Sequence, residues 1–346
     1  EDKKAADVPR EREVAAPAPA ANARRVAKAK APARAASRPS KRTPAASTSR
    51  TRETAKPRAR KTVKRVAAKA PTKASARVAA GGAVARRAPR VASAARPPAP
   101  ADGTVDGVAI SNPDKLYYPD AGISKRDVAQ YYALAAPRLL PHLAGRPLSL
   151  LRCPEGWQGE CFYQKHAPAS LSRDVGRVAV EESAGTATYA EVHSAAGLVS
   201  LAQWGVLEIH PWGSRVPRLD RPDRLIFDFD PDDAVSYATL VEGVKAMRTF
   251  LTELGLPAFA KTTGGKGLHV VVPIRASVDW DVAKGFTRAV AELMARTFPE
   301  RFVASMAKAR RSGRIFIDYL RNAEGATAIA PYALRARAGA PVAMPI

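Results

Sequence analysis

Two aspartates in the segment RLIFDFDP are the first residues of this chain that suggest chemistry. If the segment is a β-strand, its side chains alternate between two faces, so Leu225 and two phenylalanines share one face while Asp228 and Asp230 share the other. The two carboxylates would then lie about 6–7 Å apart along the backbone. Like charges this close raise each other's proton affinity unless a cation neutralises them. That cation is either a metal ion or the side chain of a nearby arginine or lysine.

A third acid, Asp318, lies in the apolar segment RIFIDYLRN, where alternation places it on the same face as Phe316. An acid inside an apolar strand is costly unless it is paired or bound to a metal. Three acids from two strands fit a nucleotidyl-transfer site with two metal ions about 3.5–4 Å apart. Two alternatives stay open, because D-x-D pairs also occur in glycosyltransferases and because the acids could form ion pairs. Arginines available for such pairs are Arg221, Arg224 and Arg321.

The segment KTTGGKGLH is glycine-rich and lies between two apolar runs. Glycines at a turn between strands, Gly265 among them, allow backbone N–H groups to face an anion, and Lys266 adds a positive charge. The spacing does not match a P-loop, and the simpler interpretation is an ordinary hairpin turn. His210 and His269 lie at strand ends beside the acid strand and this turn. Each is either a structural histidine or a hydrogen-bond donor to phosphate oxygens.

The segment CFYQKH places two aromatic residues, Phe162 and Tyr163, beside Lys165. Adjacent residues of a strand point to opposite faces, so core packing is the favoured interpretation from these residues alone. In a loop or bulge, both rings could instead serve as stacking platforms for bases. The two cysteines, Cys153 and Cys161, are too few for a disulfide framework and lack partners for a zinc site. We therefore expect reduced thiols in a cytosolic protein.

Charge is distributed unevenly along the 346 residues. The first hundred hold 27 Lys and Arg against six Asp and Glu, which accounts for +21 of the net +24. They contain no Phe, Trp, Tyr, Leu, Ile or Met, so they cannot bury enough apolar surface to offset the entropy of ordering. We expect residues 1–102 to be a disordered basic linker, either a solvated spacer or a sequence-independent DNA-binding segment. No run of 18 apolar residues occurs, so no membrane span is expected.

From about Gly103 onward, helical and strand patterns alternate. Ser124 is a plausible N-cap for a helix over 124–140, and a strong amphipathic helix is expected to end near Gly255. The other expected helices lie within 195–212, where a helix runs into a strand that ends at His210, and over 282–298. Strands are expected within 147–154, 176–182, 186–192, 224–231, 257–274 and 313–320. The pattern predicts an α/β or α+β domain of about 240 residues around a central mixed sheet.

Together these residues resemble the polymerase domain of bacterial DNA ligase D, which belongs to the archaeo-eukaryotic primase superfamily and acts in non-homologous end joining. The resemblance extends over nearly all of 110–346. The segments that carry it are LLPHLAGRPLSLLRCPEG, GECFYQKHAP, LAQWGVLEIHPW, PDRLIFDFDP, KTTGGKGLHVVVP and RIFIDYLRNAEGATAIAPYALRAR. It implies an α+β fold over 103–346, a primase-like catalytic core with an RRM-like sheet.

The resemblance also implies roles for the chemical residues. Asp228, Asp230 and Asp318 match carboxylates that hold two Mn²⁺ or Mg²⁺ ions. The positions that match contacts to the incoming NTP or dNTP, mainly its triphosphate, are His210, Thr263, Gly265, Lys266, His269 and Arg335. The family usually has Ser at position 263, and the Thr of this chain keeps the hydroxyl.

The DNA contacts follow in the same way. Lys115 and Lys125 match the pair that holds a 5′-phosphate at a DNA gap or end. Phe162 and Tyr163 match aromatics that stack against the template, which replaces core packing as our interpretation, and Lys165 is an additional contact. The implied reaction is templated and end-adding nucleotidyl transfer, with a preference for ribonucleotides, at gaps and double-strand-break ends.

The implied partners are DNA, Ku and an ATP-dependent ligase domain in the same polypeptide. Residues 1–13 resemble the tail of that ligase domain, so the linker would join the two domains. The family usually continues beyond the last residues of this chain, so a C-terminal piece is expected to be missing. The expected location is the nucleoid in the bacterial cytoplasm.

Two other functions remain as alternatives. The first is a non-catalytic DNA-end-binding module, in which Lys115 and Lys125 recognise a 5′-phosphate and the acids are structural. The second, a D-x-D glycosyltransferase, provides no reason for a DNA-seeking linker. Nucleotide incorporation in the presence of Mn²⁺ separates both from a polymerase.

Overall fold

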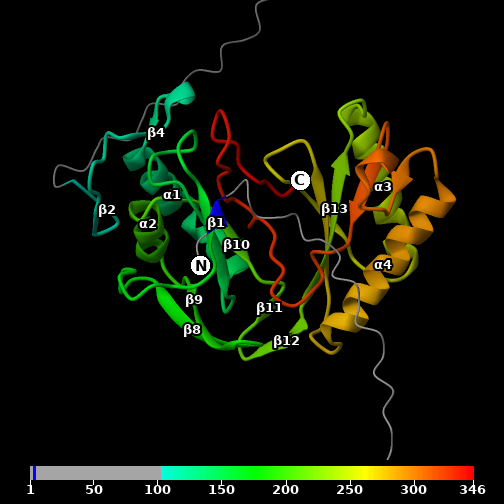
Figure 1. Cartoon of the computed structure of the whole chain (residues 1–346), viewed down its shortest axis with the longest axis horizontal. Helices are drawn as coiled ribbons and strands as arrows, with labels where there is room; N and C mark the ends of the chain where they lie inside the picture. The colour runs from blue at the N-terminus through cyan, green and yellow to red at the C-terminus, as the bar shows by residue number, and fades with distance from the viewer. Residues whose placement is uncertain (1–2, 5–102) are drawn as a thin grey trace, which may run out of the picture. The chain divides into compact units, whose positions relative to one another are not determined.

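The structure is a computed structural model that describes residues 3–4 and 103–346 (Figure 1). All of these belong to one compact unit, which comprises Glu1–Val14 and Pro97–Ile346. The predicted linker over 1–102 and the predicted ligase tail over 1–13 lie outside the described residues, apart from two residues that form a short strand.

Four α-helices form in the described part of the chain. They are α1 (Lys125–Leu143), α2 (Ala195–Gln203), α3 (Tyr237–Glu253) and α4 (Trp280–Thr297), with single 3-10 turns at η1 (Pro119–Ala121) and η2 (Lys308–Arg310). Each α-helix begins at a side-chain cap. The cap of α1 is Ser124, as predicted, and it forms a reciprocal capping box with Asp127. None of the described helices is long and apolar enough to cross a membrane.

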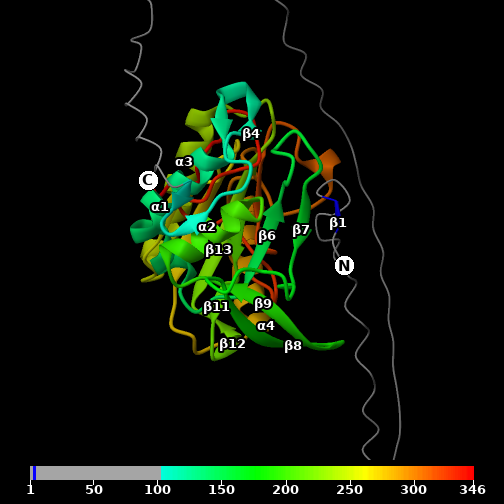
Figure 2. The same ribbon diagram turned by 90° about the vertical axis from the view of Figure 1, so that its left-hand side faces the viewer.

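The first sheet contains most of the N-terminal strands. Its order is β1 (Lys3–Lys4), β7 (Phe162–Gln164), β6 (Leu148–Arg152), β9 (Gly185–Glu191) and β8 (Gly176–Glu182), and β10 (Val206–Pro211) also pairs with β6. Helices α1 and α2 contact β10, and their apolar residues form one core with β6 and β10. Figure 2 shows this half of the molecule from the side.

The second sheet carries the acid strand. Its order is β14 (Phe259–Thr262), β15 (Leu268–Pro273), β13 (Arg224–Pro231), β17 (Ile315–Asp318) and β16 (Phe302–Val303). All neighbours are antiparallel except β16 and β17, which are parallel. Leu225, Phe227 and Phe229 lie in the core beneath α3 and α4, so the predicted alternation is confirmed and the acids occupy the opposite face.

The mixed α/β class is confirmed, but the strands divide between two larger sheets instead of one central sheet. Each sheet has its own apolar core, because each is covered by its own pair of helices. Small hairpins complete the fold, namely β2 (Thr104–Val105) with β3 (Val108–Ala109), β4 (Leu116–Tyr118) with β5 (Ile123–Ser124), and β11 (Ser214–Arg215) with β12 (Arg218–Pro222).

The C-terminal segment connects the two halves. After β17 the chain contributes Ile329 and Leu334 to the first core, and Pro345 then bridges to Lys261 on β14 (Figure 1). Arg335 therefore lies where the segment passes between the sheets.

The prediction of reduced thiols is wrong, since Cys153 and Cys161 form a disulfide. Cys153 directly follows β6, Cys161 directly precedes β7, and the antiparallel pair Arg152–Phe162 brings these strand ends together. The bond closes the short connection between the two strands.

Candidate active site

A row of polar residues crosses the second sheet on the face opposite α3 and α4. The antiparallel register places Lys261 opposite His269, His269 opposite Asp228, and Asp228 opposite Asp318. Asp230 follows two residues along β13, on the same face. The pairing of β13 with β17 therefore brings together the three acids that the sequence predicts as a cluster.

Two guanidinium groups already lie against these acids. Arg321 Nε is 3.7 Å from an Asp228 oxygen and 4.0 Å from an Asp318 oxygen. Arg311 Nη1 is 3.6 Å from an Asp230 oxygen. Of the three arginines that the sequence offered as ion-pair partners, Arg321 therefore does contact the acids. These cations compensate part of the repulsion between the carboxylates.

The other two arginines of that alternative have different partners. Arg221 bonds Asp220 and the Ser277 carbonyl, and Arg224 donates to the Trp212 carbonyl. Neither takes part in the acid row.

The buried titratable residues of the row change each other's pKa values. Burial opposes ionisation of Asp228, but His269 and then Arg321 outweigh it and hold the pKa of Asp228 well below its usual range. The His269 ring nitrogen Nε2 is 3.5 Å from Asp228, and burial with the charge of Lys261 lowers the pKa of His269 to about 4. Burial lowers the pKa of Lys261 to about 7, although the charge of Asp228 acts in the opposite direction.

Two buried polar atoms in this row lack a hydrogen-bond partner within the described part of the chain. They are Nζ of Lys261 and Nδ1 of His269. A buried donor without an acceptor costs about 1–3 kcal/mol. Oxygens of a bound phosphate group would accept a hydrogen bond from Lys261 Nζ, and from His269 Nδ1 once the ring is protonated, so the two atoms favour an anionic ligand above this face of the sheet.

The donor set suits a hard divalent cation. Carboxylate oxygens are the ligands that Mg²⁺ and Mn²⁺ prefer, and cross-strand pairing places Asp228 beside Asp318. Among the described residues, however, no three His, Cys, Asp or Glu side chains converge on a single ligand position. Arg311 and Arg321 contact the carboxylates instead, so a metal ion bound there would share the acids with two guanidinium groups.

The glycine-rich turn packs tightly against Arg335. Gly264 has φ of 69°, and a Cβ there would lie 2.5 Å from Cγ of Arg335, so both the conformation and the space require glycine. The Thr263 hydroxyl donates to the Gly267 carbonyl at 3.0 Å and accepts from the N–H of Gly265 at 3.3 Å. Arg335 also donates to the Thr263 carbonyl. The turn is therefore held in one shape with its hydroxyl directed inward.

A buried acid that the sequence analysis missed organises the predicted nucleotide contacts. Glu208 is 2% exposed, and its carboxylate lies 2.8 Å from His210 Nε2 and 2.9 Å from Arg335 Nε. Burial opposes ionisation of Glu208, but His210 and Arg335 lower its pKa to about 2. His210 and Arg335 thereby share one carboxylate, and Arg335 also reaches the Thr263 carbonyl. The sequence pattern could have revealed Glu208, because this acid lies within an apolar strand, as Asp318 does.

The two lysines predicted to hold a 5′-phosphate lie together at the start of α1. The N–H of Lys125 donates to the Lys115 carbonyl at 2.8 Å, and Lys125 is the first residue of the helix. Lys115 Nζ is 2.7 Å from Glu155, and Lys125 Nζ is 3.3 Å from the Ser111 hydroxyl. Burial and then the charge of Lys115 lower the pKa of Lys125. Two amines at a helix N-terminus make a suitable phosphate site.

The two aromatic residues predicted to stack on the template are half-buried on opposite faces of β7. The Tyr163 ring packs edge-on against His210, with centroids 5.5 Å apart. On the other face, the Arg152 guanidinium lies 5.2 Å from the Phe162 centroid and 3.6 Å from that of Trp204. Tyr163 therefore borders the Glu208 cluster, whereas Phe162 belongs to a separate stack.

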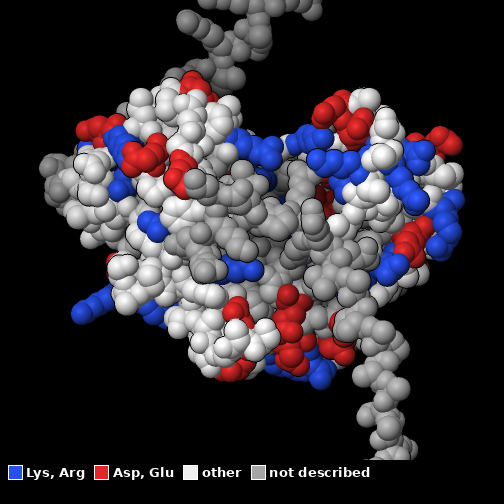
Figure 3. All heavy atoms as spheres, viewed as in Figure 1, with Lys and Arg blue, Asp and Glu red and all other residues white. Residues whose placement is uncertain are grey.

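Two predicted lysines lie at the periphery. Lys266 extends from the glycine turn, half-exposed, with Nζ 3.0 Å from an oxygen of the exposed Asp233. Lys165 is exposed just after β7, where its charge adds to the hydrogen bond from Tyr189 that lowers the pKa of Glu182. Figure 3 shows Lys and Arg side chains on both sides of the hollow between the two sheets.

The comparisons with known proteins agree on one family. The model of the LigD primase-polymerase domain matches residues 124–346. The multifunctional non-homologous end joining protein LigD of Pseudomonas aeruginosa is 41% identical over 240 residues, which is 69% of this chain and 29% of that protein. The LigD protein of Mycobacterium tuberculosis is 36% identical over 246 residues, or 69% of this chain and 32% of that protein. The chain thus spans about a third of the length of these relatives.

A solved structure supports the same assignment. The polymerase domain of Mycobacterium tuberculosis ligase D, in complex with DNA, superimposes with a TM-score of 0.66 at 36% identity and covers 69% of this chain and 86% of that one. With a family model over most of its length, this chain belongs to the LigD primase-polymerase domain family.

Proposed function

We propose that this domain is a nucleotidyltransferase that extends DNA ends and fills gaps during non-homologous end joining, as part of a larger DNA ligase. The observation that carries the proposal is the cross-strand pairing of Asp228 with Asp318, with Asp230 beside them. The relatives are named for end joining, and the similar solved domain is in complex with DNA. Both facts support a DNA substrate for this chain.

The acids would hold two divalent ions, Mn²⁺ or Mg²⁺. When bound, such ions lower the pKa of an attacking hydroxyl and neutralise the leaving group in phosphoryl transfer. His269 and then Arg321 hold the pKa of Asp228 well below its usual range, so this carboxylate is ionised at neutral pH and can bind a cation.

The remaining residues would position the substrates. Lys261 and, once its ring is protonated, His269 would be the buried donors for the triphosphate of an NTP or dNTP, and Arg335 and Lys266 add positive charge beside the glycine turn. Lys115 and Lys125 would hold a 5′-phosphate on the far side of a gap. Tyr163 and Phe162 would contact the template. Fixed donors of this kind stabilise developing negative charge without reorganisation.

The test is extension of a primer on gapped DNA with Mn²⁺, comparing NTP with dNTP and a gap with and without its 5′-phosphate. Asp228→Ala and Asp230→Ala should each abolish incorporation, while Asp220→Ala, an exposed acid on β12, should not. Near-wild-type incorporation by both active-site variants would overturn the proposal. Faster incorporation of NTP than dNTP is expected, as is a loss of efficiency without the 5′-phosphate.

A second function is supported by the lysine pair at α1, which lies apart from the acid row and would bind an anion without it. In that case the domain would only bind 5′-phosphorylated ends. DNA binding that depends on the phosphate, with no incorporation of any nucleotide, would favour it. The ligase partner domain and Ku are proposed partners of the full-length protein, and a DNA substrate would place its action at the nucleoid.

A further inference from the structure

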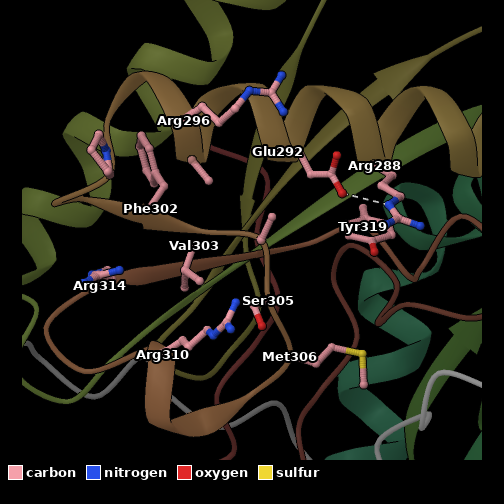
Figure 4. Close-up of a pocket in the computed structure, with 13 residues that line it drawn as sticks. Arg288, Glu292, Arg296, Phe302, Val303, Ser305, Met306, Arg310, Arg314 and Tyr319 are labelled. Carbon is pink, nitrogen blue, oxygen red and sulfur yellow. Dashed lines mark hydrogen bonds and ion pairs between the residues drawn. The ribbon is translucent and has the colours of Figure 1, made fainter.

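A basic pocket lies at the β16 edge of the second sheet, apart from the acid row. Its volume is about 480 Å³, and it is lined by α4, by the residues that follow this helix, and by the connection between β16 and β17 (Figure 4). Four arginines line it against a single acid, Glu292. The arginines are Arg288, Arg296, Arg310 and Arg314.

Most of this positive charge is not neutralised. Arg288 pairs with Glu292 at 2.8 Å in an exposed i, i+4 pair. Arg296, Arg310 and Arg314 have no carboxylate partner among residues 103–346. Three like charges around one cavity repel each other, so the arrangement favours an anion that can bind several guanidinium groups at once.

The pocket walls between the arginines are apolar. Phe302 and Tyr319 are 1% and 8% exposed and form its inner wall, and Met306 lies at one side (Figure 4). Arg314 is half-buried, whereas Arg288, Arg296 and Arg310 are exposed around this wall. The guanidinium groups can therefore be reached from solvent by an extended anion, and its binding should weaken as salt concentration rises.

One connection borders both the pocket and the acid row. Arg311 of residues 304–314 extends to Asp230 at 3.6 Å, with its guanidinium 3.8 Å from the centroid of Phe316. Its neighbour Arg310 lines the pocket. Since β16 is the edge strand and only two residues long, the path from the acid face to the pocket around this edge is short.

We propose that the pocket binds the phosphodiester backbone of a nucleic-acid strand that passes the acid row and continues around the β16 edge. The proposal rests on the proposed function, which brings a DNA strand to the acids. Arginine forks bind phosphate oxygens in pairs. Arg288 and Arg296 are eight residues apart on α4, about 12 Å at 1.5 Å per residue, which exceeds the rise of about 3.4 Å per phosphate along one strand. More than one phosphate can therefore be bound.

The test measures DNA binding by the full chain in the absence of metal and nucleotide, by fluorescence anisotropy at several salt concentrations. The variant is Arg296→Gln with Arg314→Gln. The matched control is Arg248→Gln with Arg218→Gln, two exposed arginines on α3 and β12. The probes are a blunt duplex and the same duplex with a single-stranded overhang, and thermal melting checks that both variants are folded.

The pocket variant should bind the overhang DNA about 5–20-fold more weakly than wild type. The slope of log K against log salt concentration should fall by about 1.5, because two phosphate contacts are lost. The control should change neither quantity by a comparable amount. Equal affinity and slope for the pocket variant and its control would overturn the proposal.

Two further binding measurements test other ligands, a free triphosphate and an acidic peptide. A loss of ATP binding with unchanged DNA binding would assign the pocket to a free triphosphate and overturn the strand proposal. If a polyglutamate peptide binds as tightly as DNA of the same charge, and the pocket variant loses both interactions, the strand proposal is also overturned. The assay needs no incorporation, so a failure of Asp228→Ala to abolish extension bears on the proposed function and not on this pocket.

Discussion

Asp228 and Asp318 lie directly opposite each other on β13 and β17, and the Arg321 guanidinium lies within 4.0 Å of both carboxylates. The position between these acids is therefore already occupied by a positive charge. A metal ion and this arginine would compete for the same two carboxylates. The first two predictions test that relationship.

Arg321→Gln removes the competing charge while keeping a polar side chain of similar reach. We expect Mn²⁺ to bind about 3–10-fold more tightly, because the carboxylates lose the cation that neutralises them. The measurement is titration of free Mn²⁺ by electron paramagnetic resonance. Arg221→Gln, which removes an arginine paired with Asp220, is the control and should leave the affinity unchanged. Weaker Mn²⁺ binding by Arg321→Gln would mean that this arginine supports the ligands instead of competing with them.

Asp318→Asn should separate folding from metal binding. The Asp318 Oδ1 atom accepts the N–H of Leu320 at 2.8 Å, and an asparagine oxygen can keep this bond. Removal of one of three clustered carboxylates should leave the melting temperature without metal unchanged or slightly raised. Incorporation of nucleotide should fall at least 100-fold, and the stabilisation of the protein by Mn²⁺ should disappear. A variant that melts higher in Mn²⁺, as the wild type is expected to do, contradicts a ligand role for Asp318.

Lys261→Met should stabilise the protein and impair nucleotide binding. Burial lowers the pKa of Lys261 from 10.5 to about 7, so the unfolded chain holds this proton more tightly than the folded protein. Below pH 7 the buried Lys261 is charged, and the folded protein bears the full free-energy cost of burying that charge. This cost shrinks as pH rises from 7 to 10.5, and it is absent above 10.5. At pH 7 the variant should gain at most about 4 kcal/mol in free energy of unfolding. Urea unfolding across this pH range measures the gain.

The matched control for that experiment is Lys245→Met, an exposed lysine on α3. Its free energy of unfolding should differ little from wild type at any of these pH values. The Lys261 variant should also show a raised KM for NTP. An unchanged KM would remove Lys261 from the nucleotide site even if the stability gain is observed.

Glu208→Gln should destabilise the protein in a pH-dependent manner. The folded-state pKa of about 2 lies below the ordinary 4.5, so ionised Glu208 stabilises the fold above pH 4.5, and this contribution is lost as pH falls toward 2. We expect the free energy of unfolding to fall by about 3 kcal/mol at pH 7 and by less at pH 3, as measured by urea unfolding. Glu300→Gln, an exposed acid, should show no such difference. A loss of equal size at both pH values would mean that packing, not charge, explains the effect.

Arg152→Met tests the stack on the outer face of β7. The substitution keeps the aliphatic stem but removes the cation between Phe162 and Trp204, which should cost about 1 kcal/mol of stability. If Phe162 contacts the template, the KM for template DNA should rise several-fold while the KM for NTP stays the same. Arg173→Met, at an exposed position before β8, is the control. An equal rise in both KM values would argue for general disruption of the first sheet.

Much of the active site was predictable from local patterns. Alternation along RLIFDFDP was enough to place Asp228 and Asp230 on one face and the phenylalanines in the core, because successive side chains of any strand point to opposite sides. The Ser124 cap follows from equally local hydrogen bonding. The excess positive charge of the first hundred residues and the order of the family's motifs can also be read from the sequence alone.

Strand register depends on contacts between distant parts of the chain, so the tertiary structure alone decides it. Asp228 and Asp318 are ninety residues apart, and only the pairing of β13 with β17 makes them neighbours. The same holds for Glu208 and Arg335, which are far apart in the chain and meet only because the C-terminal segment packs against β10. The sequence by itself determined which residues are acidic, basic or apolar on each strand. The packing of two sheets and the C-terminal segment decided which of those charges meet, because electrostatic and hydrogen-bond energies depend on distances that no local pattern contains.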